Sequence, residues 1–315
     1  MGSVNLSTVQ AAASWVGIPL PSPDPSNVAG NMAACLAAAS VEFLRLTGRG
    51  PMNFSVPFVS PYTQSVAYTE TYNGNGNTEL FTRNFPITSI TSITVNGLSL
   101  MASTGQGQAG YAIGNSGKSV ALLTGTGGSG SPATFYEYPY GGFGFGRFGF
   151  SRYGFPRGQS NIQISYTAGF AAQGIVGELD TIPATAPYTV TVSSVAGGSP
   201  WLTDDGVNYF IGGAPLTPVL TSPTTGQYYV QGNGVYLFAT ADTGKQVLIN
   251  YTAAGTPGDI ILAVNQMVAL NFKRRQWIGQ ESVAMKDVGS TKYTLLLDPE
   301  ILRVINYYKR VGIGN

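Results

Sequence analysis

Hydrophobic side chains follow a helical period at both ends of the chain. They recur every three or four positions over residues 9–16, where Ser7 is a predicted N-cap, and over residues 32–46, in a helix that Ser26 or Asn27 opens. Towards the C-terminus, Asp259 is the predicted N-cap of a helix that ends in basic residues, and Asp298-Pro299 opens a last helix. The pattern therefore predicts helices at the two ends.

Between these ends the period changes to two, which is typical of β-strands. Alternation starts at Val66 and continues through short runs to the turn Asn96-Gly97. A second set of short apolar runs fills residues 171–254, each bounded by Gly, Pro, Asp or Ser. We interpret the first set as a β-meander and the second as a small β-sandwich or barrel.

One short sequence occurs twice. The run ISYTAG at residues 164–169 is echoed by INYTAAG at residues 249–255, and only the second copy leads into a predicted helix. The simplest interpretation is that residues 171–250 are an inserted β-module. The alternative is that two strand ends became similar by chance.

These patterns predict an α+β fold. The N- and C-terminal helices would form a helical core, to which the β-meander and the inserted β-sandwich or barrel are added. The predicted domains are residues 1–50 (N-terminal helices), 51–170 (meander with a Gly- and aromatic-rich loop at 103–160), 171–256 (inserted module) and 257–315 (C-terminal helices and tail).

The amino-acid composition excludes several classes of functional site and favours a subunit of an assembly. The chain has 315 residues, of which 43% are hydrophobic and only 10% charged, with a net charge of +1. Because it contains no histidine and a single cysteine, a Ser-His-Asp or Cys-His triad, an internal disulfide and a Cys-rich zinc site are excluded. A weakly charged, near-neutral surface favours association, so we expect a subunit of a larger assembly. We expect no transmembrane helix and no signal peptide.

Glycine and aromatic residues alternate in one unusual stretch. Residues 144–149 spell GxGxxG, but no helix is predicted to follow, so nucleotide binding is disfavoured. Contact with single-stranded nucleic acid or carbohydrate remains open. We favour a loop that packs on a neighbouring subunit or partner. Its predicted contact residues are Phe143, Phe145, Arg147, Phe148, Phe150, Arg152, Tyr153 and Phe155.

Acidic residues offer little catalytic chemistry. Asp204-Asp205 could serve a glycosidase or a calcium site with Glu178 and Asp180, but Asp204-Asp205-Gly206 is more simply a β-turn. Aromatic residues of the module could stack on sugars, although core or interface roles are commoner for them. These aromatic residues are Trp201, Tyr209, Tyr228, Tyr229 and Tyr236. We therefore predict no catalytic residue, no metal and no cofactor.

The basic cluster Lys273, Arg274 and Arg275 has two interpretations. It could contact DNA, or it could complement the dipole at the end of a helix, which is the simpler reading. From Asp259 to the end there are eight Lys or Arg against five Asp or Glu. This region is therefore the most basic part of the chain, whereas the inserted module is the most acidic.

Four motifs follow the N-terminal helices in order: TETYNGNG (69–76), PITSITSI (86–93), YTAAG (251–255) and PGDIILA (257–263). In this order the chain resembles the head–tail connector proteins of tailed bacteriophages, also called adaptor or head-completion proteins. The resemblance covers the two ends and the meander. Family members are usually shorter, and this chain adds the Gly-aromatic loop and the block 171–250, which resembles a β-module repeated across phage tail and neck proteins.

The resemblance implies a structural virion protein without enzymatic activity. The chain would form a homo-oligomeric ring of about twelve copies under the portal protein. The ring would extend the DNA channel, let packaged DNA pass without sequence readout, and carry the tail or the next neck protein. It implies assembly in the host cytoplasm, a final place in the neck of the virion, and no membrane partner.

The resemblance also implies that the C-terminal segment docks on the portal. Onto this sequence the docking residues map as Ile301, Leu302, Val304, Ile305, Tyr307, Tyr308, Lys309 and Arg310. The alternative function is that of a phage surface, tail-fibre or capsid-decoration protein that binds its target through the β-module.

Overall fold

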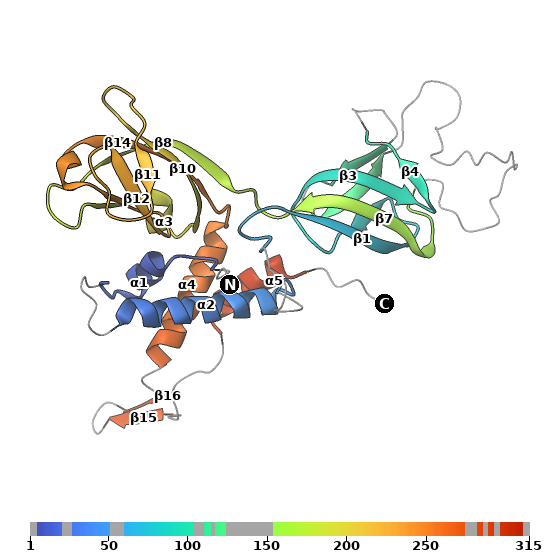
Figure 1. Ribbon diagram of the computed structural model, residues 1–315. Coiled ribbons are helices and arrows are strands. Elements are labelled where there is room, and N and C mark those ends of the chain that lie inside the picture. The colour runs from blue at the N-terminus through green and yellow to red at the C-terminus, as the bar shows by residue number, and fades with distance from the viewer. Residues whose placement is uncertain are drawn as a thin grey trace, which may run out of the picture. The chain divides into compact units, whose positions relative to one another are not determined.

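The computed structural model (Figure 1) describes residues 5–20, 27–50, 60–103, 110–114, 117–123, 154–274, 282–285, 289–292 and 297–310. The chain divides into two compact units. Unit 1 comprises Met1–Gln64 and Ala171–Lys309, and unit 2 comprises Ser65–Phe170 and Arg310–Asn315. Within the described residues, no helix is long and apolar enough to cross a membrane.

Most of the regular structure is β-strand. The described residues form sixteen strands in five sheets and only five α-helices. The predicted α+β fold, a helical core with a meander and one small β-module, is therefore wrong. The reason is that the strands between residues 66 and 168 pair across long sequence distances into two sheets, which enclose a core of their own instead of forming an open meander.

Four helices of unit 1 share a core. They are α1 (Val9–Val16), α2 (Val28–Leu46), α4 (Gly258–Arg274) and α5 (Pro299–Tyr308). Each buries one apolar stripe, as the helical period predicts. The fully buried side chains of this core include Leu6, Met32, Leu36, Phe43, Leu44, Tyr62, Ile260, Val264, Val268 and Ile301.

The helix starts differ from the prediction at two of four places. Asn27, one of the two residues predicted to open the second helix, is the N-cap of α2. Thr8, not Ser7, caps α1, because its Oγ1 accepts a hydrogen bond from Ala11 N at 3.2 Å. Helix α4 begins at Gly258, so Asp259 lies inside its first turn. The cap of α5 is confirmed, since Asp298 Oδ1 accepts from Glu300 N at 2.8 Å and Pro299 follows it.

The first β-module lies in unit 2 and has seven strands. They are β1 (Val66–Gly74), β2 (Glu79–Phe81), β3 (Ile87–Val95), β4 (Leu98–Leu100), β5 (Gly110–Ile113), β6 (Ser119–Leu123) and β7 (Gly158–Ala168). Their sheets have the orders β1-β7-β3-β4 and β2-β6-β5, and both contribute to one core. Because β5 and β6 fall inside residues 103–160, the prediction of one continuous loop there is wrong.

The second β-module lies in unit 1 and also has seven strands. They are β8 (Gln173–Thr181), β9 (Thr189–Thr191), β10 (Trp201–Tyr209), β11 (Thr217–Val219), β12 (Gln227–Gly232), β13 (Val235–Phe238) and β14 (Gln246–Ala253). The sheets β10-β14-β8 and β11-β12-β13-β9 enclose one core, so the module is a β-sandwich. A short helix, α3 (Ser193–Ala196), follows β9, and a separate hairpin of β15 (Ser282–Met285) and β16 (Gly289–Lys292) follows α4.

The two modules have the same topology. In each, the last strand pairs antiparallel with the first and the third strand, and the sixth pairs with the second and the fifth. The fourth strand joins a different sheet in each module, because β4 pairs antiparallel with β3 whereas β11 pairs parallel with β12. The chain next to it makes the complementary contact in each module, through the isolated bridges Ala102–Tyr111 and Asn208–Pro215. Six strands with one order and one pairing scheme, together with a fourth strand that runs between the same two neighbours, make β1–β7 and β8–β14 two copies of one structural unit.

The register supports the same conclusion in detail. The third strand of the first module breaks register with the last strand between Ile87 and Ser89 and between Ile90 and Ser92. The equivalent strand of the second module breaks register at the matching places, between Trp201 and Thr203 and between Asp204 and Gly206. Bulges add one residue to one strand at a defined position, so two shared bulges tie the modules together beyond their topology.

The repeated YTA sequence therefore marks equivalent strands. The two copies form the ends of β7 and β14, the central strands that pair on both sides. The connection before this last strand differs between the modules, because it runs from Leu123 to Gly158 in the first and only from Phe238 to Gln246 in the second. The Gly- and aromatic-rich stretch thus occupies the one connection that is greatly lengthened.

The second module is docked on the helices of unit 1. Thr8 Oγ1, which caps α1, also donates to Val195 O of α3 at 2.7 Å. Gly198 follows α3 with a φ of +94°, and a Cβ there would lie 2.6 Å from Ile261 Cγ2. Only glycine allows both this backbone angle and this close approach.

Candidate functional site

The acidic side chains of both modules are engaged by tyrosines. Tyr166 OH donates to Glu70 Oε2 at 2.6 Å in the first module, and Tyr251 OH donates to Glu178 Oε2 at 2.5 Å in the second. Both glutamates lie on the first strand of their module, and each faces the isoleucine two residues before its tyrosine, Ile164 or Ile249. The Glu–Tyr pair is thus a repeated structural feature.

Asp204 is also part of such a cluster. It lies within β10, so the prediction of a β-turn at Asp204-Asp205 is wrong, and the bulge at Gly206 accounts for the turn-like sequence. Tyr228 OH donates to Asp204 Oδ2 at 2.6 Å, and Tyr236 OH donates to Asp204 Oδ1 at 3.1 Å. Burial and the nearby carboxylate raise the pKa of both tyrosines, which keeps their hydroxyls protonated as donors.

This cluster limits what the module can bind. Tyr228 and Tyr236 are fully buried, so they cannot stack on a sugar. Trp201 is half-buried, and its Nε1 donates to Tyr236 OH at 3.2 Å. Tyr209 donates to Asp242 Oδ1 at 2.7 Å. Of the five aromatic residues considered for sugar stacking, these four have roles in the core or its hydrogen bonds.

Two further carboxylates of the second module, Asp242 and Asp180, have shifted pKa values. Asp242 is fully buried, and although burial opposes ionisation, hydrogen bonds from Lys245 Nζ, Tyr209 OH and Gly226 N hold its pKa below the ordinary value. Burial, together with the charge of Glu178, raises the pKa of Asp180. Across the described residues, no group of three or more acidic or cysteine side chains is placed to hold a metal ion.

In unit 2, Arg310 joins the Glu70 cluster. Arg310 Nη2 donates to Glu70 Oε1 at 3.2 Å, and Tyr72 OH also donates to Glu70 Oε2. Burial is the first cause of the raised pKa of Tyr72. Arg310, one of the residues assigned to portal docking, therefore has an intramolecular partner.

The other residues assigned to portal docking divide between two faces of α5. Ile301, Ile305 and Tyr308 are buried in unit 1, where Tyr308 OH donates to Asp259 Oδ1 at 3.0 Å. Leu302 and Tyr307 are 43% and 60% exposed. Val304 is half-buried and Lys309 is exposed. Only part of the predicted docking segment is thus available to a partner.

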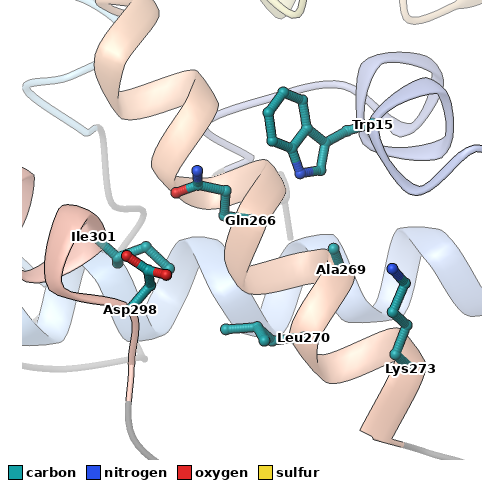
Figure 2. Close-up of a pocket in the computed structure, with 7 residues that line it drawn as sticks. All are labelled: Trp15, Gln266, Ala269, Leu270, Lys273, Asp298 and Ile301. Carbon is teal, nitrogen blue, oxygen red and sulfur yellow. The ribbon is translucent and has the colours of Figure 1, made fainter.

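An apolar depression of about 200 Å³ lies beside this helix (Figure 2). It is lined by Trp15, Gln266, Ala269, Leu270, Lys273, Asp298 and Ile301. The Trp15 ring of α1 forms one side and Asp298 and Ile301 of α5 the other, with α4 between them. Trp15 is 51% exposed, which is unusual for so large an apolar side chain.

Sequence reasoning missed this depression, although one signal was present. The inward face of the first helix was assigned to Val9, Ala12, Ala13 and Val16, and Trp15 falls outside that face. A tryptophan on the outer face of an amphipathic helix indicates a contact site. Its companions on α4 and α5 are more than 240 residues away in the chain, so no local pattern could have linked them.

Most residues of the predicted contact loop, and part of the basic cluster, lie outside the described part of the chain. The loop residues Phe143, Phe145, Arg147, Phe148, Phe150, Arg152 and Tyr153 lie outside the described residues. Phe155 is described and is fully buried in the core of the first module, so it is a core residue rather than a partner contact. Lys273 is exposed at the end of α4 on the rim of the depression, Arg274 is the last residue of the helix, and Arg275 lies outside the described residues.

Comparison with known proteins adds no assignment. No protein-family model matches the chain, and no curated protein is significantly similar to it. The function is therefore argued from the residues and the geometry of the chain itself.

Proposed function

We propose that the protein is a structural virion component, a head–tail adaptor whose copies form a ring that binds the portal, extends the DNA channel and joins the tail or the next neck protein. The observation that carries the proposal is the exposed apolar surface of α1, α4 and α5. Trp15, Leu262, Leu302 and Tyr307 are all more than one-third exposed on these helices, and Trp15 also lines an apolar depression. Such surfaces mark protein interfaces.

The polar groups of the modules support a structural role. Glu70, Glu178, Asp204 and Asp242 each accept a hydrogen bond from at least one tyrosine hydroxyl. A catalytic carboxylate must instead face a substrate within hydrogen-bonding distance. In these clusters the carboxylates stabilise the fold, which suits a protein that acts by holding partners together.

We infer the partners from the resemblance of the sequence motifs. The order of the four motifs resembles that of head–tail connectors, and the structure places the first two in the first module and the last two at the junction of β14 and α4. DNA passing through the ring would meet few charges, because only 10% of the residues are charged. Lys273 complements the dipole at the end of α4, where its charge is favourable without DNA.

Portal binding is tested on the exposed face of α5. Deleting residues 298–315 would be uninformative, because the deletion also removes buried side chains of unit 1. The double variant Leu302→Ser/Tyr307→Ser changes only exposed side chains, and we expect it to reduce capture of the portal protein at least tenfold.

The control for this experiment is Asn306→Ser, an exposed position on the same helix. Both proteins should unfold at the temperature of the wild type. Portal capture that survives Leu302→Ser/Tyr307→Ser without loss would contradict the docking assignment. Negative-stain electron microscopy of the purified wild type separately tests whether rings form.

A further inference from the structure

An apolar loop projects from the second β-module. It joins β10 to β11 and carries Phe210 and Ile211, the latter 84% exposed, followed by Gly212 and Gly213 with positive φ. In the first module the equivalent connection is the polar turn Asn96-Gly97. Because the two modules share one scaffold, this difference shows that an apolar tip is not required by the fold.

The same unit also carries an apolar hollow. The depression beside Trp15 holds about 200 Å³, and its apolar lining includes Ala269, Leu270 and Ile301. An apolar cavity of roughly 150 Å³ is large enough for benzene. The depression is therefore large enough to accept the side chain of an isoleucine or a phenylalanine.

The charges of the two regions are complementary. Residues 171–255, which include the loop, contain five acidic residues and one lysine. Residues 257–315, which include α4 and α5, contain eight basic and five acidic residues. The lining of the depression carries both Lys273 and Asp298, so the complementarity lies in the net charges of the two regions. Opposite net charges on two regions of one chain favour an approach of unlike regions from two copies.

We propose that Phe210 and Ile211 of one copy insert into the Trp15 depression of the next copy. A knob and a hollow on the same chain make a head-to-tail contact, which closes into a ring when the rotation between copies allows it. The inference rests on the proposed ring function and adds its subunit interface. The occupant of the depression is thus a second copy of this chain.

Cross-linking tests the contact directly. We would replace Cys35 by serine, then mix one protein carrying Ile211→Cys with another carrying Ala269→Cys, and oxidise the mixture. We expect a disulfide-linked dimer in the mixture that is at least tenfold more abundant than in either protein alone. The matched control is Leu220→Cys with Ala269→Cys, because Leu220 is 88% exposed on the same module but outside the loop.

Sedimentation velocity separates the contact from the ring itself. Ile211→Asp should weaken self-association at least tenfold, whereas Leu220→Asp should leave it unchanged. Rings that persist in Ile211→Asp, or equal cross-linking from Leu220→Cys, would overturn the contact while leaving the ring function standing. A wild-type chain that stays monomeric would overturn both the contact and the ring. Portal binding would still be tested separately, by capture of the portal protein with the α5 variants.

Discussion

Removing the tyrosine hydroxyl from each repeated Glu–Tyr pair tests whether the two modules are structurally equivalent. Tyr166→Phe and Tyr251→Phe delete equivalent donors, at 2.6 Å from Glu70 and 2.5 Å from Glu178, without opening a cavity. A hydrogen bond to a charged group contributes about 1.5–3 kcal/mol. Both acceptors keep other donors, since Asn84 and Arg310 bond Glu70 and the Ser193 N and Oγ bond Glu178. We therefore expect a loss of stability near the lower end of that range, about 1.5–2 kcal/mol, at each site.

The assay must resolve the modules separately. Hydrogen exchange followed by mass spectrometry does so, because local opening energies are read from individual peptides. Tyr166→Phe should accelerate exchange in β1, β3 and β7 but not in β8, β10 and β14, and Tyr251→Phe should do the reverse.

The control is Tyr229→Phe, because Tyr229 is a half-buried tyrosine of β12 that belongs to neither Glu–Tyr pair, and it should change neither set of peptides. A change of under about 0.5 kcal/mol at either pair would refute the reasoning, because surface substitutions alone stay within that range. Unequal losses at the two sites would refute the equivalence of the modules.

Three further predictions follow from the packing. Gly198→Val should destabilise the docking of the second module by about 2 kcal/mol or more, because it strains a positive φ and meets Ile261, and limited proteolysis should then cleave near α1 and α3. Tyr72 and Tyr166 should titrate well above pH 10 in the native protein, because burial raises the pKa of both. Below pH 10 both hydroxyls are protonated in the folded and the unfolded chain, so the free energy of unfolding is unaffected. Above pH 10 only the unfolded chain loses these protons, so the free energy of unfolding should fall by about 1.4 kcal/mol per pH unit for each tyrosine. Absorbance at 295 nm and thermal unfolding between pH 8 and 11 measure this, and native titration near the ordinary tyrosine value would contradict it. Residues 65–170 should fold alone, since the first module has its own core, and their circular dichroism should show a cooperative unfolding transition.

Part of the fold was predictable because it depends on local pattern. The four long helices begin and end within a few residues of the predicted places, and Asp298 caps α5 as expected. The repeated YTA sequence was visible as well, since a central strand that pairs on both edges and buries every second side chain retains its apolar and tyrosine positions. Its interpretation as one inserted module was incomplete, because the likeness of the partner strands does not show in their sequences.

Other features could not be predicted from local pattern. β5 and β6 were missed because glycine-rich flanks hide short strands, and Asp204-Asp205 was assigned to a turn because a bulge and a turn favour the same residues. Phe155 was assigned to a contact loop, although the first module needs it in its core.

The sequence by itself determined the helical ends, the alternating strands, the absence of histidine chemistry and the split between an acidic module and a basic C-terminus. Only the tertiary structure decided that the strands form two equivalent modules, that the carboxylates are held by tyrosines, and that Trp15 borders an apolar depression with α4 and α5. The physical reason is the separation along the chain between the residues that interact. Periodicity and caps act over a few residues, whereas strand pairing, burial of a hydroxyl against a carboxylate and the lining of a depression join residues that are far apart in the chain.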